Sequence, residues 1–179
     1  MGTNFLSTNY LKIIFTVLGI IFIYWVFTFE INRHKKIISQ KKWVKGAIIE
    51  ANYSYYNLVY EVNNKIYNTK ISPTLGGLQV SEQYRIYYDT LDPSNCFVSF
   101  KYPILGNESF DTLTSIKIEN DKINKGVKFQ YEINKVKYVR NQRLPDSINS
   151  LDEDKFYNLI YREDNHKIAY LLTLLSEKK

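Results

Sequence analysis

Few side chains in this sequence could carry out chemistry. The two histidines, His34 and His166, are far apart along the chain, and Cys96 is the only cysteine. A histidine-based metal site or a nucleophilic triad needs several such groups together, so both lack components here. Cys96 also alternates with strand residues, which is typical of a small core side chain. We therefore predict no catalytic residue, no metal site and no cofactor.

Acidic and glycine-rich stretches do not change this prediction. The run Asp152-Glu153-Asp154 and the pair Asp89/Asp92 offer carboxylates, but acids in predicted turns are usually solvated. The segment "PTLGGLQV" (73–80) has two glycines but no Lys-Ser or Lys-Thr after them, so it is not a phosphate-binding loop. The prediction is a protein that is not an enzyme.

The clearest signal in the chain is an uncharged apolar segment, "IIFTVLGIIFIYWVFTF", at 13–29. Apolar residues cover every side of it, unlike an amphipathic core helix, and with its flanks it reaches bilayer thickness. A cleaved signal peptide is the alternative, but the bulky residues at 26–30 do not suit a cleavage site. We predict a retained transmembrane helix at about residues 10–31. The residues predicted at the membrane interface are Lys12, Trp25, Arg33, Lys35, Lys36, Lys41 and Lys42.

Charge predicts both orientation and partner class. Residues 1–42 hold six basic residues and one acid, a net of +5, while residues 43–179 hold 18 basic and 17 acidic residues, a net of +1. Basic residues crowd the C-terminal flank of the apolar segment, so the positive-inside rule places the C-terminal part in the cytoplasm. The same basic stretch could instead clamp anionic lipid. Because residues 43–179 are nearly neutral, we predict no nucleic-acid partner.

After residue 42 the pattern changes to the alternation of half-buried strands, as in "VKFQYEI" (127–133). Asparagine pairs or Asn-Lys at 63–64 and 134–135 suit tight hairpin turns. Ser150 with Glu153 resembles a capping box and predicts one short helical turn. The predicted strands are 44–51, 56–62, 65–71, 83–89, 96–101, 113–119, 127–133, 136–142, 156–161 and 168–174.

The β region also contains an internal repeat. "YEVNNKIY" (60–67) returns as "YEINKVKY" (131–138) at an offset of 71 residues, and residues 84–98 match 157–171 at an offset of 73. Matching order in four strands predicts a duplicated module. The predicted organisation is an anchor with a basic juxtamembrane segment (1–42), then two small antiparallel barrel or sandwich modules (43–102 and 112–175).

The stretch "YYDTLDPSN" (87–95) resembles the conserved turn of a bacterial family catalogued as domain of unknown function 3592. The resemblance covers about residues 43–100, and the second copy diverges from it at Asn165 and His166. It implies a small β domain attached to a membrane, with no assigned activity. The turn-motif residues carried over are Tyr88, Asp89, Asp92 and Pro93.

Together these features predict a single-pass, membrane-anchored β protein at a bacterial inner membrane, with the bilayer and another protein as partners. It would be a non-enzymatic binding or scaffold module, and an immunity-type protein that binds one toxin is a special case. The alternatives are a periplasm-facing envelope component, or an enzyme with an unfamiliar site between the two modules.

Overall fold

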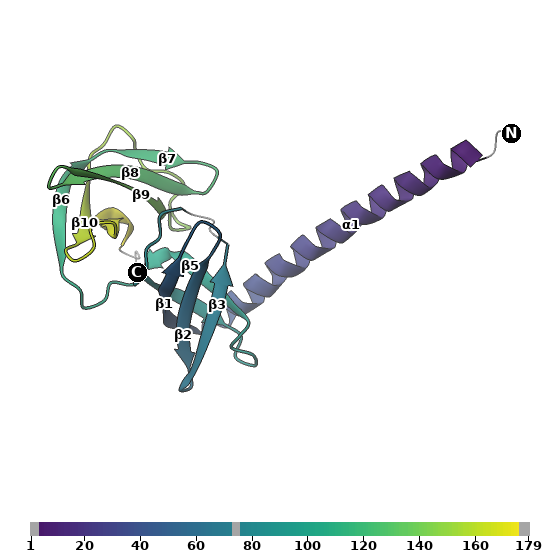
Figure 1. Ribbon diagram of the computed structural model, residues 1–179, viewed down its shortest axis with the longest axis horizontal. Helices are drawn as coiled ribbons and strands as arrows, with labels where there is room; N and C mark the ends of the chain where they lie inside the picture. Colours follow the sequence, from purple (N-terminus) through teal and green to yellow (C-terminus); the bar gives the residue numbers. More distant parts are fainter. Residues whose placement is uncertain (1–3, 73–75, 176–179) are drawn as a thin grey trace. The chain divides into compact units, whose positions relative to one another are not determined.

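The computed structural model describes residues 4–72 and 76–175, which form a mainly β protein with one N-terminal helix. It divides into two compact units, Met1–Lys41 and Lys42–Lys179. Unit 1 contains helix α1 (Asn4–Ser39), and unit 2 contains three antiparallel sheets (Figure 1). The strands are β1 (Trp43–Ala51), β2 (Tyr56–Val62), β3 (Lys65–Ile71), β4 (Gln83–Tyr88), β5 (Cys96–Pro103), β6 (Phe110–Ile116), β7 (Ile118–Asp121), β8 (Gly126–Ile133), β9 (Val136–Arg143), β10 (Tyr157–Arg162) and β11 (Ala169–Leu171), followed by the 3-10 helix η1 (Leu172–Leu174).

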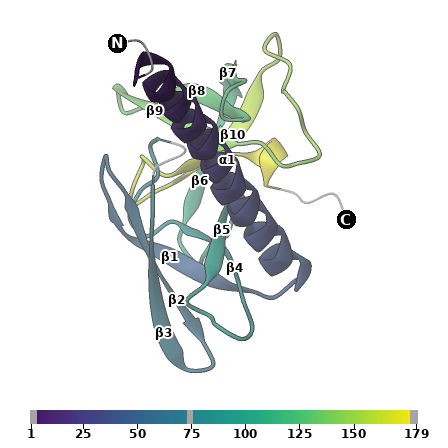
Figure 2. The same ribbon diagram turned by 90° about the vertical axis from the view of Figure 1, so that its right-hand side faces the viewer.

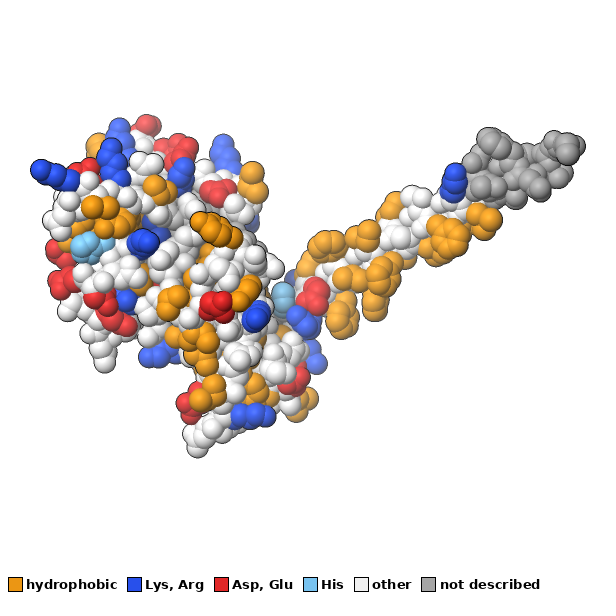
Figure 3. All heavy atoms as spheres, viewed as in Figure 1, with side chains coloured by type: hydrophobic (Ala, Val, Ile, Leu, Met, Phe, Trp, Pro, Cys, Tyr) orange, Lys and Arg blue, Asp and Glu red, His pale blue; other side chains and the backbone are white. Residues whose placement is uncertain are grey.

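Helix α1 is longer than the predicted 10–31 and is apolar enough to cross a membrane. It continues through the basic stretch because residues 30–39 contain neither glycine nor proline. It ends where Lys41 adopts a positive φ of 54° and the Gln40 amide bonds the Ile37 carbonyl. Exposed hydrophobic side chains cover its middle (Figure 3).

The first five strands form one sheet in the order β3-β2-β1-β4-β5. The β2–β3 hairpin turns through Asn63 and Asn64, both at positive φ, as the sequence predicts for a two-residue turn. In β1, Gly46 allows close packing, because a Cβ there would lie 2.1 Å from Ile86 Cδ1. One face of the sheet holds a core that includes Ile48, Leu58 and Ile86, all at most 1% exposed.

The remaining strands form two three-stranded sheets, β11-β10-β6 and β7-β8-β9. The predicted strand 113–119 is divided into β6 and β7 at Lys117, two residues after Ser115, whose positive φ of 61° bends the backbone. β6 pairs with β10 and β7 pairs with β8, so this one stretch contributes to both sheets. Figure 2 shows the five-stranded sheet below and the later strands above it.

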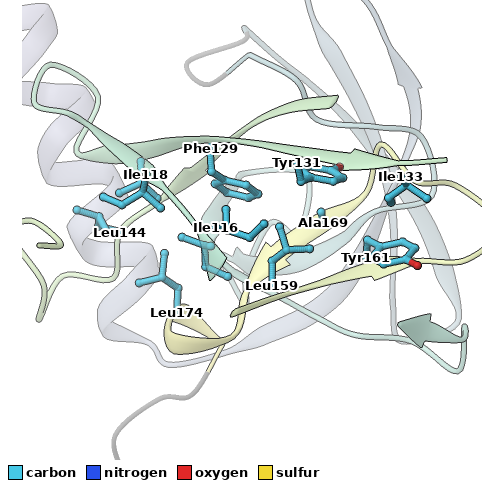
Figure 4. Close-up of a cluster of buried hydrophobic side chains, with 12 residues drawn as sticks. Ile116, Ile118, Phe129, Tyr131, Ile133, Leu144, Leu159, Tyr161, Ala169 and Leu174 are labelled. Atoms are coloured by element: carbon cyan, nitrogen blue, oxygen red, sulfur yellow. The ribbon is translucent and has the colours of Figure 1, made fainter. Parts of the chain in front are cut away.

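A second core lies between these two sheets (Figure 4). Phe129 and Tyr131 of β8 point toward Leu159 and Tyr161 of β10, and Leu174 of η1 closes one end. Burial of alternate side chains along β8 explains why the period-two pattern located this strand correctly.

Two local predictions are wrong. The strand predicted at 168–174 ends at Leu171, and the chain then turns into η1, which buries Leu174. No helix starts at Ser150; the chain makes a turn in which the Lys155 amide bonds the Asp152 carbonyl. The carboxylate of Glu153 accepts the backbone amide of Asn120 at 2.8 Å, a distant partner that replaces the expected cap.

Candidate functional site

The predicted membrane-interface residues lie along α1 and just after it. Lys12 and Arg33 are 21 residues apart, which corresponds to about 32 Å along a helix and matches the hydrocarbon thickness of a bilayer. Trp25 is 60% exposed and stacks on Phe29 at 5.8 Å between ring centroids. Arg33 bonds Glu30 at 2.9 Å, which compensates the one acid of this segment. The side chains of Lys35, Lys36, Lys41 and Lys42 are exposed.

The predicted turn motif lies between β4 and β5, with Tyr88 as the last residue of β4. The Asp89 amide bonds the Asn95 carbonyl at 2.9 Å, and Asp92 Oδ1 accepts both the amide and the hydroxyl of Ser94. The carbonyl of Pro93 accepts the Tyr60 hydroxyl at 2.7 Å. These contacts give the motif a structural role in holding a rigid turn against β2.

A buried ion pair joins the two halves of the β unit. Glu82 precedes β4 and Arg140 lies on β9; Arg140 Nη2 donates to Glu82 Oε2 at 2.5 Å. The two side chains are 0% and 1% exposed. A buried charge pair of this kind needs further hydrogen bonds to offset its lost hydration.

Those hydrogen bonds are present and come from both halves. The hydroxyls of Tyr84 and Tyr170 donate to Glu82 Oε2 at 2.5 and 3.0 Å, and the Gln79 amide donates to Oε1 at 2.5 Å. Arg140 also donates to the Gly77 carbonyl, and its guanidinium lies 5.6 Å from the centre of the Tyr170 ring. We call Glu82, Tyr84, Arg140 and Tyr170 the seam cluster.

The electrostatics of the seam cluster keep its two tyrosines and its arginine protonated. Burial, with the negative charge of Glu82, raises the pKa values of the Tyr84 and Tyr170 phenols well above their ordinary value. Burial lowers the pKa of Arg140, but Glu82 together with Tyr84 and Tyr170 outweighs this, and the net pKa is raised. Both phenols therefore remain donors and the guanidinium remains charged. A cavity of only about 10 Å³ lies beside the cluster, enough for one water at most.

Strand β3 is the second feature of functional interest, because it lies at the edge of its sheet and pairs only with β2 among the described strands. In a two-residue hairpin the closing pair, Val62 and Lys65, exchanges backbone hydrogen bonds, and alternate pairs follow. The amides and carbonyls of Ile66, Asn68 and Lys70 therefore point away from the sheet. Ile66 is 71% exposed.

The seam cluster was missed by sequence reasoning, although one signal for it exists. In β9, Arg140 and Gln142 occupy the positions that face the core, opposite Phe129 and Val127 of β8. A charged and a polar residue on the apolar side of a strand indicate a buried polar partner. The identity of that partner, 58 residues earlier, is not readable from a single sequence.

Comparison with protein-family models, curated proteins and solved structures finds no match for this chain. The resemblance of residues 43–100 to a membrane-attached β-domain family therefore stays a prediction. Among residues 4–72 and 76–175, no group of three His, Cys, Asp or Glu side chains is placed to hold a metal ion.

Removing one member of the buried pair tests the seam. Glu82→Gln leaves the guanidinium of Arg140 buried without its counter-charge, and we expect the free energy of unfolding to fall by about 3–5 kcal/mol. The double variant Glu82→Gln/Arg140→Met should lose less than the sum of the single losses. Denaturant unfolding of the full chain in detergent, followed by circular dichroism, measures both.

The matched control is Glu119→Gln, which breaks an exposed pair with Lys128 at 3.9 Å. Its loss should stay below about 1 kcal/mol. A Glu82→Gln loss no larger than that of the control contradicts the assignment of the seam cluster as the joint between the halves.

Proposed function

We propose that this chain is a single-pass protein of a bacterial inner membrane whose β unit binds another protein without catalysing a reaction. The observation that carries the proposal is the outer edge of β3, which presents an exposed isoleucine, two lysines and backbone groups that no described strand pairs. An immunity-type protein that binds one toxin is a special case of this function.

The length and composition of α1 support the membrane anchor. Its apolar middle is flanked by Lys12 and Arg33 at a spacing that fits a bilayer, and tryptophan and phenylalanine lie near one end. The exposed side chains of this segment would be costly in water, since a contiguous apolar surface of this size is rare on soluble proteins.

Charge supports a cytoplasmic location for the β unit. Five of the predicted interface lysines and arginines follow the apolar segment, and one, Lys12, precedes it. The free thiol of Cys96 is compatible with a reducing compartment. A periplasm-facing envelope component is the alternative.

Thiol labelling measures this orientation. In a Cys96→Ala background, Leu91→Cys places one thiol on the β4–β5 turn, where the native side chain is 92% exposed. We expect a membrane-impermeant maleimide to leave this thiol unlabelled in intact cells and to label it after permeabilisation. Labelling in intact cells would contradict the cytoplasmic orientation and favour the envelope alternative.

Strand addition at β3 is the binding mode that the edge supports. An extended segment of a partner would bond the outward backbone groups of Ile66, Asn68 and Lys70. Lys65 and Lys70 are the charged residues of β3, and the strand has no acid, so the partner segment should carry carboxylates. The side chain of Ile66 offers the apolar contact.

A photo-crosslinking residue at position 66 tests this mode in the cells that produce the protein. We expect a crosslinked adduct of one discrete mass, and we expect Asn68→Pro to abolish it. The proline removes the outward amide of residue 68 and none of the β2–β3 ladder bonds, so the sheet should persist. Circular dichroism checks folding.

The repeat supplies matched controls for this experiment. Lys137 and Val139 of β9 correspond to Ile66 and Asn68 at the offset of 71. A crosslinker at 137 should give no such adduct, and Val139→Pro should leave the adduct at 66 intact. An adduct that survives Asn68→Pro, or one at twice the mass of the chain, would overturn strand addition by a separate partner.

Common strand pairing in the two halves supports a duplicated module. β1 pairs with β2 and β4, β2 with β3, and β4 with β5; in the second half β7 pairs with β8, β6 with β10, β8 with β9, and β10 with β11. This order of pairing is the one expected if the second half is a copy of the first in which β1 is divided into β6 and β7. In each copy the pairing would build one small barrel or sandwich module.

Side-chain contacts repeat as well. Tyr60 stacks on Tyr67 at 5.6 Å and 19°, and Tyr131 stacks on Tyr138 at 5.4 Å and 18°. The Tyr60 hydroxyl bonds the Pro93 carbonyl, and the Tyr131 hydroxyl bonds the carbonyl of His166, the counterpart of Pro93 at the offset of 73. The motif turn and its diverged copy therefore perform the same structural task.

The seam cluster itself does not support the enzyme alternative. A reaction at Glu82 would need room for a substrate, whereas the cavity beside Glu82 and Tyr170 measures about 10 Å³. The carboxylate of Glu82 is already paired with Arg140 and accepts hydrogen bonds from three further donors, which suits a structural role better than proton transfer.

A further inference from the structure

A hollow of about 560 Å³ lies where the end of β5, the β7–β8 turn and the loop after β9 meet. Three cationic residues line it, Lys101, Lys125 and Arg143, and each comes from a different segment of the chain. Its volume falls within the range of pockets that bind small molecules.

The charges of this hollow are unbalanced. Asp146 is its one carboxylate, and it is occupied by Lys101, whose Nζ lies 2.5 Å from Asp146 Oδ1. Within residues 4–72 and 76–175, neither Lys125 nor Arg143 has an anionic partner. The Nε of Arg143 is buried and has no hydrogen-bond partner in the same residues. Gathered cations repel one another unless an anion offsets them.

The chemistry of the lining indicates which anion would bind. A guanidinium presents a planar set of hydrogen-bond donors that matches the oxygens of phosphate. A lysine ammonium group acts as a point charge and attracts the phosphate from any direction. Pro145 and Ile148 form an apolar part of the wall, and the side-chain amide of Asn149 can bond a ligand hydroxyl or carbonyl. The hollow is larger than a phosphate ion alone requires.

We propose that this hollow, which we call the basic hollow, binds a small molecule or lipid headgroup that bears a phosphate group. Arg143 and Lys125 contact the phosphate, and Asp146 holds Lys101 at the rim. The basic hollow takes Lys101 from β5, the strand at the opposite edge of the sheet from β3, and its other lining residues from 123–149. The proposal therefore stands independently of strand addition.

Titration with inorganic pyrophosphate tests the proposal on the full chain in nanodiscs of zwitterionic lipid. We expect saturable binding by calorimetry below about 10 mM, and each of Arg143→Gln and Lys125→Gln should weaken it about tenfold or more. Lys135→Gln removes an exposed charge of the same sign from the β8–β9 turn and should leave the affinity unchanged.

Asp146→Asn distinguishes a site from a folding defect. It removes the one negative charge of the basic hollow and releases Lys101, so pyrophosphate should bind more tightly, an outcome that damage to the fold would not produce. Absence of saturable binding, or equal weakening by Lys135→Gln, would overturn the proposal. If nanodiscs containing phosphatidic acid compete with pyrophosphate, the phosphate group belongs to a lipid headgroup. If they do not compete, it belongs to a soluble phosphorylated molecule.

Discussion

The burial of Glu82 together with Arg140 constrains the whole β unit. Either charge alone in this position would be strongly destabilising, so the two halves must meet in the one arrangement that brings both side chains and their tyrosine donors together. Hydrophobic contacts are not directional, so two sheets could pack through them in several registers. A buried ion pair is satisfied in only one register, the one that brings the two charges together. We infer that the pair specifies the joint in addition to stabilising it.

The joint also distinguishes the two halves, which we propose to be copies of one module. At the repeat offsets, Glu82 corresponds to Lys155 and Arg140 to Thr69, so the ion pair has no second copy. Side chains at the edge of the second half are used internally: the Leu171 amide bonds Gln142 Oε1 of β9 at 2.9 Å. β3 and β9 are both outer strands of their sheets, so this side-chain contact is what distinguishes the two edges.

Short-range chemistry made most of the fold predictable. Asn63-Asn64 and Asn134-Lys135 form the predicted turns, because asparagine tolerates positive φ, and alternating burial located the strands. Contacts between residues far apart in the sequence could not be predicted in this way. The carboxylate of Glu153 bonds the backbone amide of Asn120 instead of capping a helix, and the buried ion pair joins residues 58 positions apart. The division of one strand into β6 and β7 depends on backbone geometry at Ser115 that no residue type signals.

Amide hydrogen exchange of the full chain in detergent, resolved by residue, tests the central claim that no other strand covers the edge of β3. The account predicts alternation along the strand: slow exchange at Lys65, Tyr67 and Thr69, which bond β2, and fast exchange at Ile66, Asn68 and Lys70. Uniform protection along β3 would show that another strand already covers this edge, and would contradict the account.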